Sequence, residues 1–130
     1  MSASPSFTGI ESVVLRVRSR QAAVAWYRAA LGLQVLFEDP AEGMAVLNVG
    51  QGCSLTIWEL PAGAEGTTAA ASGTFPILEA VDAGAQQRHL QSRGVVTSEL
   101  RETASLRCFT FWDLDSNRLD VCEVLEAVSR

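Results

Sequence analysis

The sequence contains no lysine and only one histidine, so its ten basic side chains are all arginines. The absence of lysine excludes Schiff-base chemistry and a phosphate-binding loop built around a lysine. Fifteen acidic residues outnumber the arginines and give a net charge of −5. Nucleic-acid binding requires a basic face that neutralises phosphates, so nucleic acid is not an expected partner. The acidic balance favours a neutral or cationic ligand instead.

Long apolar runs are missing as well. No stretch approaches the about 20 apolar residues that a membrane-spanning helix needs. The segment MSASPSFTGI lacks the basic start and the apolar centre of a secretory signal. We therefore expect no membrane association and a cytoplasmic location.

Cysteine is scarce, and its spacing does not indicate a metal or redox motif. Cys53, Cys108 and Cys122 form an odd set without C-x-x-C spacing, and each lies in or beside an apolar run. This pattern predicts reduced thiols inside strands, with a reactive thiol as the alternative.

The apolar content that is present suits a globular fold. Hydrophobic residues make up 48% of the chain and charged residues 19%, both in the ordinary range. A chain of 130 residues buries roughly two-thirds of its unfolded surface on folding. We therefore expect a single domain that spans residues 1–130.

The hydrophobic pattern of the first half predicts a strand, a helix and three strands. Residues 10–18 alternate in polarity, and the following stretch has apolar residues at helical spacing up to Gly32. Turn residues then separate three short strands at 33–39, 43–49 and 53–60. The first half therefore has the order βαβββ.

The second half repeats this order after a connection rich in Gly, Ala and Thr at residues 61–73. Strand and helix patterns follow in the segments 74–82, 83–94, 95–102, 105–113 and 118–126. Ser19 and Asp82 occupy equivalent places before the two helices, and aligning the closing strands sets Thr56 against Asp120. We predict an α+β fold in which two βαβββ modules, about 9–60 and 74–126, form a concave, partly open cup of mixed sheets with the helices outside. The alternative is an α+β order without a repeat.

Three segments carry a family resemblance. VVLRVRSRQAAVAWYRAALGL, PILEAVDAGAQQRHLQSRGV and CFTFWDLDSNRLDVCEV occur in this order along the chain. Together they resemble the glyoxalase, bleomycin-resistance and extradiol-dioxygenase superfamily, also called vicinal oxygen chelate proteins. The third segment departs from the superfamily pattern at Leu114, where proline is usual, and at Ser116, where glycine is usual. These departures predict a different backbone in that turn.

The resemblance implies four inward positions at which metal-dependent members place their ligands. In this sequence they fall on Ser12, Thr56, Phe75 and Asp120, and only Asp120 is a good metal ligand. Glu79 lies on the same predicted face as Phe75 and offers a second carboxylate. We therefore expect no cofactor and no firmly held metal, with Asp120 and Glu79 as a weak candidate pair.

Other candidate residues carry less information. His89 lies in the second helix outside the ligand pattern and is expected to be a solvated helix residue. No G-x-S-x-G elbow occurs, which excludes a Ser-His-Asp triad of that kind. Trp58 and Phe75 are expected either to form aromatic walls of the cup or to pack in the core. Asp120 or Glu79 could transfer a proton, although a hydrogen bond to a ligand or to Arg16 is the simpler role.

These observations favour a metal-independent protein that binds a small aromatic or cationic compound, such as an antibiotic. The cleft is expected to be lined by Ser12, Val14, Arg16, Thr56, Trp58, Phe75, Glu79 and Asp120. The alternatives are a metal-dependent lyase, isomerase or dioxygenase of the same superfamily, and a subunit or regulator that has kept only the fold. The resemblance also implies a homodimer, because superfamily members commonly pair modules across chains. The cup could close within one chain or between two.

Overall fold

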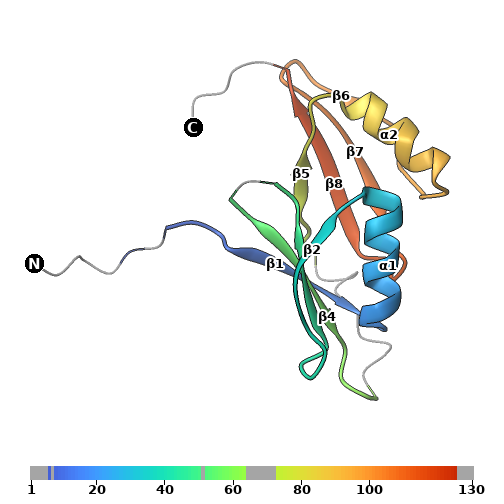
Figure 1. The fold of residues 1–130 in the computed structure, drawn as a ribbon. Coiled ribbons are helices and arrows are strands. Elements are labelled where there is room, and N and C mark those ends of the chain that lie inside the picture. The colour runs from blue at the N-terminus through green and yellow to red at the C-terminus, as the bar shows by residue number, and fades with distance from the viewer. Residues whose placement is uncertain (1–5, 7, 51, 64–72, 126–130) are drawn as a thin grey trace, which may run out of the picture.

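A computed structural model describes residues 6, 8–50, 52–63 and 73–125 of the chain (Figure 1). The first half forms one sheet in the strand order β1-β4-β3-β2, in which β1 runs parallel to β4 and the other pairs are antiparallel. Its elements are β1 (Ser12–Val17), α1 (Arg20–Leu31), β2 (Gln34–Asp39), β3 (Met44–Asn48) and β4 (Ser54–Glu59).

The second half repeats this topology. Its sheet has the order β5-β8-β7-β6, with β5 parallel to β8 and the other pairs antiparallel. Its elements are β5 (Ile77–Glu79), α2 (Ala83–Ser92), β6 (Arg101–Glu102), β7 (Leu106–Trp112) and β8 (Arg118–Val124). Figure 1 shows α1 and α2 on the same side of their sheets, on the right in this view. The predicted α+β fold of two βαβββ modules is confirmed.

The two helices begin in the same way, as the repeat predicted. Ser19 is the N-cap of α1 and its side chain accepts a hydrogen bond from the backbone N–H of Ala22 at 3.1 Å. Asp82 is the N-cap of α2 and accepts from the N–H of Ala85 at 3.0 Å. Such caps satisfy backbone donors that have no partner within the helix.

Some predicted strands are longer than the observed ones. The strand expected at 95–102 is reduced to β6, because Ser98 binds the backbone of Thr110 through its own N–H and its hydroxyl, and Thr97 makes only an isolated bridge to Phe111. The strand expected at 74–82 is likewise reduced to β5. Positions 64–72 of the predicted linker and position 126 of the last predicted strand lie outside the described residues.

A hydrophobic cluster fills the space between the helices and the sheets of both halves. Trp26 is partly buried and packs against this cluster, whereas its neighbour Tyr27 is fully buried. The largest fully buried side chains are Tyr27, Phe109, Phe111, Leu47, Leu55, Ile57, Leu119, Val17 and Asn117.

The turn between β7 and β8 ties the second half to the first. The Tyr27 hydroxyl donates to Asp113 Oδ2 at 2.7 Å, and the Asn117 side-chain amide donates to the carbonyl of Arg16 at 3.0 Å. Burial and the negative charge of Asp113 raise the pKa of Tyr27, so the phenol stays neutral and can donate. Ser116 adopts a left-handed φ of 65°, the conformation that glycine favours, so this residue of the turn keeps the glycine conformation.

The prediction of reduced thiols is wrong for two of the three cysteines. Cys108 on β7 and Cys122 on β8 are directly opposite Cα partners, 4.4 Å apart, and form a disulfide. This Cα separation is typical of a non-hydrogen-bonded antiparallel pair, in which side chains approach most closely. Disulfides persist mainly in oxidising compartments, and this one therefore does not support the expected cytoplasmic location. That location stays a prediction. Cys53 is a free thiol.

In the described part of the chain, no helix is long and apolar enough to cross a membrane.

Candidate functional site

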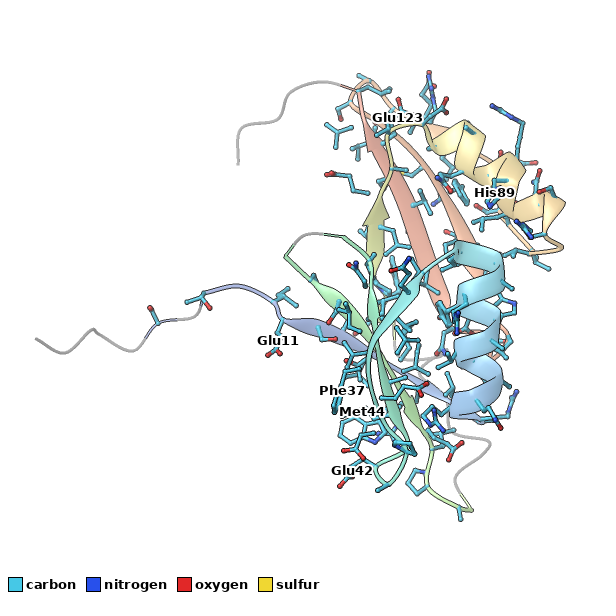
Figure 2. The ribbon with its side chains drawn as sticks, in the orientation of Figure 1. Glu11, Phe37, Glu42, Met44, His89 and Glu123 are labelled. Atoms are coloured by element: carbon cyan, nitrogen blue, oxygen red, sulfur yellow. A yellow bond between two sulfur atoms is a disulfide. The ribbon has the colours of Figure 1, made fainter. Side chains whose placement is uncertain are left out.

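Each sheet has one face against the helices and one open face. Along β1, Leu15 and Val17 are buried in the core, so the intervening Ser12, Val14 and Arg16 lie on the opposite face. Figure 2 shows Phe37 and Met44 on the side of the first sheet that is turned away from α1. In the second sheet Phe109, Phe111, Leu119 and Val121 pack in the core, which leaves Thr110 and Asp120 on the open face.

The five predicted site residues of the first half share the open face of the first sheet. The Ser12 and Thr56 hydroxyls are hydrogen-bonded at 2.6 Å. The Arg16 guanidinium lies over the Trp58 ring, 5.3 Å from its centroid, and donates to the carbonyl of Glu59 at 3.1 Å. Val14 is exposed. Trp58 is therefore part of a cation–π pair on the open face and not of the hydrophobic cluster.

The three predicted residues of the second half lie on the open face of the second sheet. Ile77 of β5 is the Cα partner of Asp120, and Glu79 is the Cα partner of Cys122. The Arg118 guanidinium lies 3.8 Å from the centroid of the Phe75 ring. Phe75 is therefore stacked beneath an arginine at the end of this face.

Asp120 is surrounded by hydrogen-bond donors. Arg118 donates from Nε to Oδ1 at 3.0 Å and from Nη2 to Oδ2 at 3.1 Å. The Thr110 hydroxyl donates to Oδ1 at 2.7 Å, and Arg101 Nη2 lies 3.8 Å from Oδ2. Burial acts to raise the pKa of Asp120, but these hydrogen bonds and the two positive charges outweigh it and hold the pKa below its ordinary value. Asp120 is thus an ionised hydrogen-bond acceptor, unsuited to donate a proton.

Sequence reasoning missed Arg101, Thr110 and Arg118. The signal for Arg118 was present, because residues 118 and 120 of one strand share a face. Thr110 and Arg101 could not be found in this way, because they reach Asp120 from other strands and their register is set only by the fold.

The residues present do not fit a catalytic metal. Ser12 and Thr56 are neutral hydroxyls bonded to one another, and Phe75 offers no donor atom. Both oxygens of Asp120 already accept charge-assisted hydrogen bonds. Among the described residues, no group of three or more His, Cys, Asp or Glu side chains is placed to hold a metal ion. A firmly bound metal normally needs three or four such protein donors.

A cleft of about 650 Å³ lies between the first and second sheets. This volume suits a small organic molecule. Phe75 and Glu79 line the cleft, whereas the other six predicted residues are not part of its lining. Its walls are formed by Ile10, Val13, Val49, Gly50, Cys53, Ser54, Leu55, Phe75, Pro76, Ile77, Leu78 and Glu79.

His89 is exposed on α2, as expected for a solvated helix residue (Figure 2). Its backbone carbonyl accepts a hydrogen bond from the Ser92 hydroxyl at 2.6 Å. It belongs to the helix layer and not to the open faces.

The topology and the open faces define an α+β protein built from paired βαβββ modules, in which each sheet turns one face away from the core. The family model of the Glyoxalase/Bleomycin resistance protein/Dioxygenase superfamily matches residues 9–121, and the chain belongs to this superfamily. The resemblance inferred from the sequence is confirmed.

Solved structures share this fold at low sequence identity. TnmS3, an antibiotic binding protein from Streptomyces sp. CB03234, superposes with a TM-score of 0.75 at 20% identity, covering 93% of this chain and 99% of that one. A glyoxalase/bleomycin resistance protein/dioxygenase from Nocardioides gives 0.72 at 23% identity, covering 97% and 89%. A putative glyoxalase family protein from Bacillus anthracis gives 0.77 at 15% identity, covering 94% and 99%. No curated protein matches the sequence.

Proposed function

We propose that this protein binds a small aromatic molecule on the open faces of its sheets and does so without a metal ion. The observation that carries the proposal is the state of Asp120. This residue is the one good metal ligand among the four family positions, and its carboxylate is bound by Arg118 and Thr110. A carboxylate held in this way supports the ligand-binding face and does not serve as a free metal ligand.

The remaining side chains of the open faces suit an aromatic ligand. Arg16 with Trp58 and Arg118 with Phe75 form two flat stacked pairs, against which a planar ligand can pack. Phe37 is 54% exposed and adds a further aromatic ring to the open face of the first sheet. TnmS3, which has the same fold, is an antibiotic binding protein, and this supports ligand binding as the function of the fold here.

We further propose that two copies of the chain pair through these open faces. Val14, Phe37 and Ile77 are 44%, 54% and 61% exposed, and they lie on the open faces of the two sheets. A second copy placed by a twofold axis would set the first sheet of one chain opposite the second sheet of the other. Each cup would then combine Trp58 from one chain with Asp120 from the other, which brings the two groups of predicted residues to one ligand.

The metal content of the purified protein tests the proposed function. We expect zinc, nickel, manganese and iron to be far below one ion per chain, and the melting temperature to be unchanged when these ions are added. Near-stoichiometric metal that is lost in Asp120→Ala would overturn the proposal and favour a metal-dependent lyase, isomerase or dioxygenase.

A thermal-shift screen of planar aromatic compounds tests the ligand directly. A ligand at about a hundred times its Kd adds about 2.7 kcal/mol to the free energy of unfolding. We expect Trp58→Leu to abolish the shift that an aromatic hit produces. Arg107→Gln is a matched control, because Arg107 pairs with Glu102 and Glu123 and lies on the helix side of β7. The absence of any hit would favour a subunit or regulator that has kept only the fold.

A further inference from the structure

Two arginines from different strands converge on Asp120 at the open face of the second sheet. Arg118 comes from β8 and Arg101 from β6. The Asp120 side chain is 9% exposed, whereas the side chains of Arg118 and Arg101 are 42% and 54% exposed. The carboxylate is therefore buried beneath two guanidinium groups that reach the surface of the open face.

The guanidinium groups have hydrogen-bonding capacity beyond their contacts with Asp120. A guanidinium carries five N–H donors. Within the described residues, Arg118 uses Nε and Nη2 on Asp120, and Arg101 uses Nη2 on Thr110 and Asp120. Nη1 of both residues and Nε of Arg101 have no protein acceptor among these contacts. The outward donors are therefore available to a molecule on the open face.

The local charge around these donors is positive. Two guanidinium groups face one carboxylate, and Asp120 cannot neutralise both. On the same face, Glu79 is the Cα partner of Cys122, which lies two residues along β8 from Asp120. That spacing is about 7 Å along the strand, with Glu79 on the neighbouring strand, and Asp120 is the acidic group that acts on the Arg118 guanidinium. The end of the face near Arg118 and Phe75 thus attracts an anionic group despite the net negative charge of the chain.

The same end of the face also recognises a flat ring. One side of the Arg118 guanidinium lies on Phe75, and the group is held in place by its two hydrogen bonds to Asp120. A fixed, planar guanidinium binds carboxylate oxygens through its edge and stacks aromatic rings on its face.

We propose that Arg118 and Arg101 select planar aromatic ligands that carry a carboxylate. This inference rests on the proposed ligand-binding function and reverses one expectation from the sequence, in which the acidic composition favoured neutral or cationic ligands. Asp120 is a positioning residue here, because it orients Arg118 and does not itself meet the ligand anion.

Three matched probes test the inference: 2-naphthoate, the neutral 2-naphthamide and the cationic 2-naphthylmethylammonium. Titration calorimetry at neutral pH should rank the affinities in that order. Charge-assisted hydrogen bonds are worth enough to make naphthoate bind roughly tenfold more tightly than naphthamide. Raising the salt concentration should weaken the binding of naphthoate and leave that of naphthamide unchanged.

Arg101→Gln and Arg118→Gln should each weaken naphthoate roughly tenfold and leave naphthamide within about twofold. Arg107→Gln removes the same charge from the same hairpin on the other face and should change neither affinity. Circular dichroism and melting curves verify the fold of each variant, and Arg101→Gln keeps the test valid if Arg118→Gln does not fold.

The outcomes separate the two proposals. Equal binding of naphthoate and naphthamide, or equal losses in Arg101→Gln and Arg107→Gln, would overturn the selection for anions and leave the proposed function standing. Binding of none of the three probes would overturn both proposals.

Discussion

Asp120 and Asp115 are both buried carboxyls, but their surroundings act on them in opposite directions. At Asp120, hydrogen bonds from Arg118 and Thr110 outweigh burial and lower the pKa. At Asp115, burial and the neighbouring charge of Asp113 outweigh the contacts with Arg18 and raise the pKa. At the scale of single residues, the donors around a carboxyl group therefore decide whether it stays charged.

We predict that the side-chain carboxyl signals in a carbon-13 NMR titration will place the Asp120 pKa below 3.8 and the Asp115 pKa above 3.8, their ordinary value. The stabilisation from Asp120 is present above pH 3.8 and is lost as the pH falls through its lower folded-state pKa. The ionisation of Asp115 destabilises the fold, and this penalty is relieved as the pH falls from its folded-state pKa towards 3.8. Ordinary values for both groups would contradict the described contacts.

A second prediction at the residue scale concerns the contribution of the Tyr27 hydroxyl to the stability of the fold. Tyr27→Phe removes the 2.7 Å hydrogen bond to Asp113 inside the core, so we expect the free energy of unfolding to fall by about 2 kcal/mol in urea denaturation. Ser92→Ala removes an exposed hydroxyl bond to the His89 carbonyl and should change it by less than about 0.5 kcal/mol. Equal effects of the two substitutions would argue against the buried contact.

At the scale of elements, the hairpin of β7 and β8 contains the main features of the second half that the first half lacks among the described residues. It holds the disulfide, the acceptor Asp120, the donor Thr110 and the turn that contacts α1 and β1. Thr110 and Asp120 are Cα partners, and Cys108 and Cys122 are the next pair on the same face. The pairing register of this hairpin thus places the disulfide beside the candidate site.

We expect the disulfide to stabilise the folded chain by a measurable amount. Its closed loop spans a sequence separation of 14 residues, for which the loss of unfolded-chain entropy gives about 3 kcal/mol. We expect the double variant Cys108→Ala and Cys122→Ala to lose about this amount in urea denaturation, whereas Cys53→Ala should lose less. A thiol count on the denatured, unreduced protein should give one reactive cysteine, and a count of three would contradict the pairing.

The elements that follow from local patterns were predictable from the sequence. Alternation along β1 correctly separated Leu15 and Val17 from Ser12 and Arg16, and cap residues marked the start of both helices. The parts that depend on cross-strand register were not predictable. The disulfide and the approach of Arg101 to Asp120 both require knowing which residues of neighbouring strands are opposite one another.

At the scale of the whole molecule, the open faces of the two sheets remain without a protein partner within one described chain. Because we propose a homodimer, we expect light scattering after size-exclusion chromatography to give twice the mass of one chain. Phe37→Asp places a charge on the open face and should produce a monomer. Val81→Asp is the control, because Val81 is 98% exposed outside the strands and should leave the dimer intact. A monomeric wild-type protein would contradict the proposed pairing.

The central claim is that the open faces bind an aromatic molecule without a metal ion. The most direct measurement is the Kd of 2-naphthoate for protein treated with EDTA and dialysed, compared with the same protein after addition of zinc, nickel, manganese or iron(II). We predict binding in the metal-free protein with a Kd that none of these ions changes. Binding that occurs only after a metal is added would contradict the account.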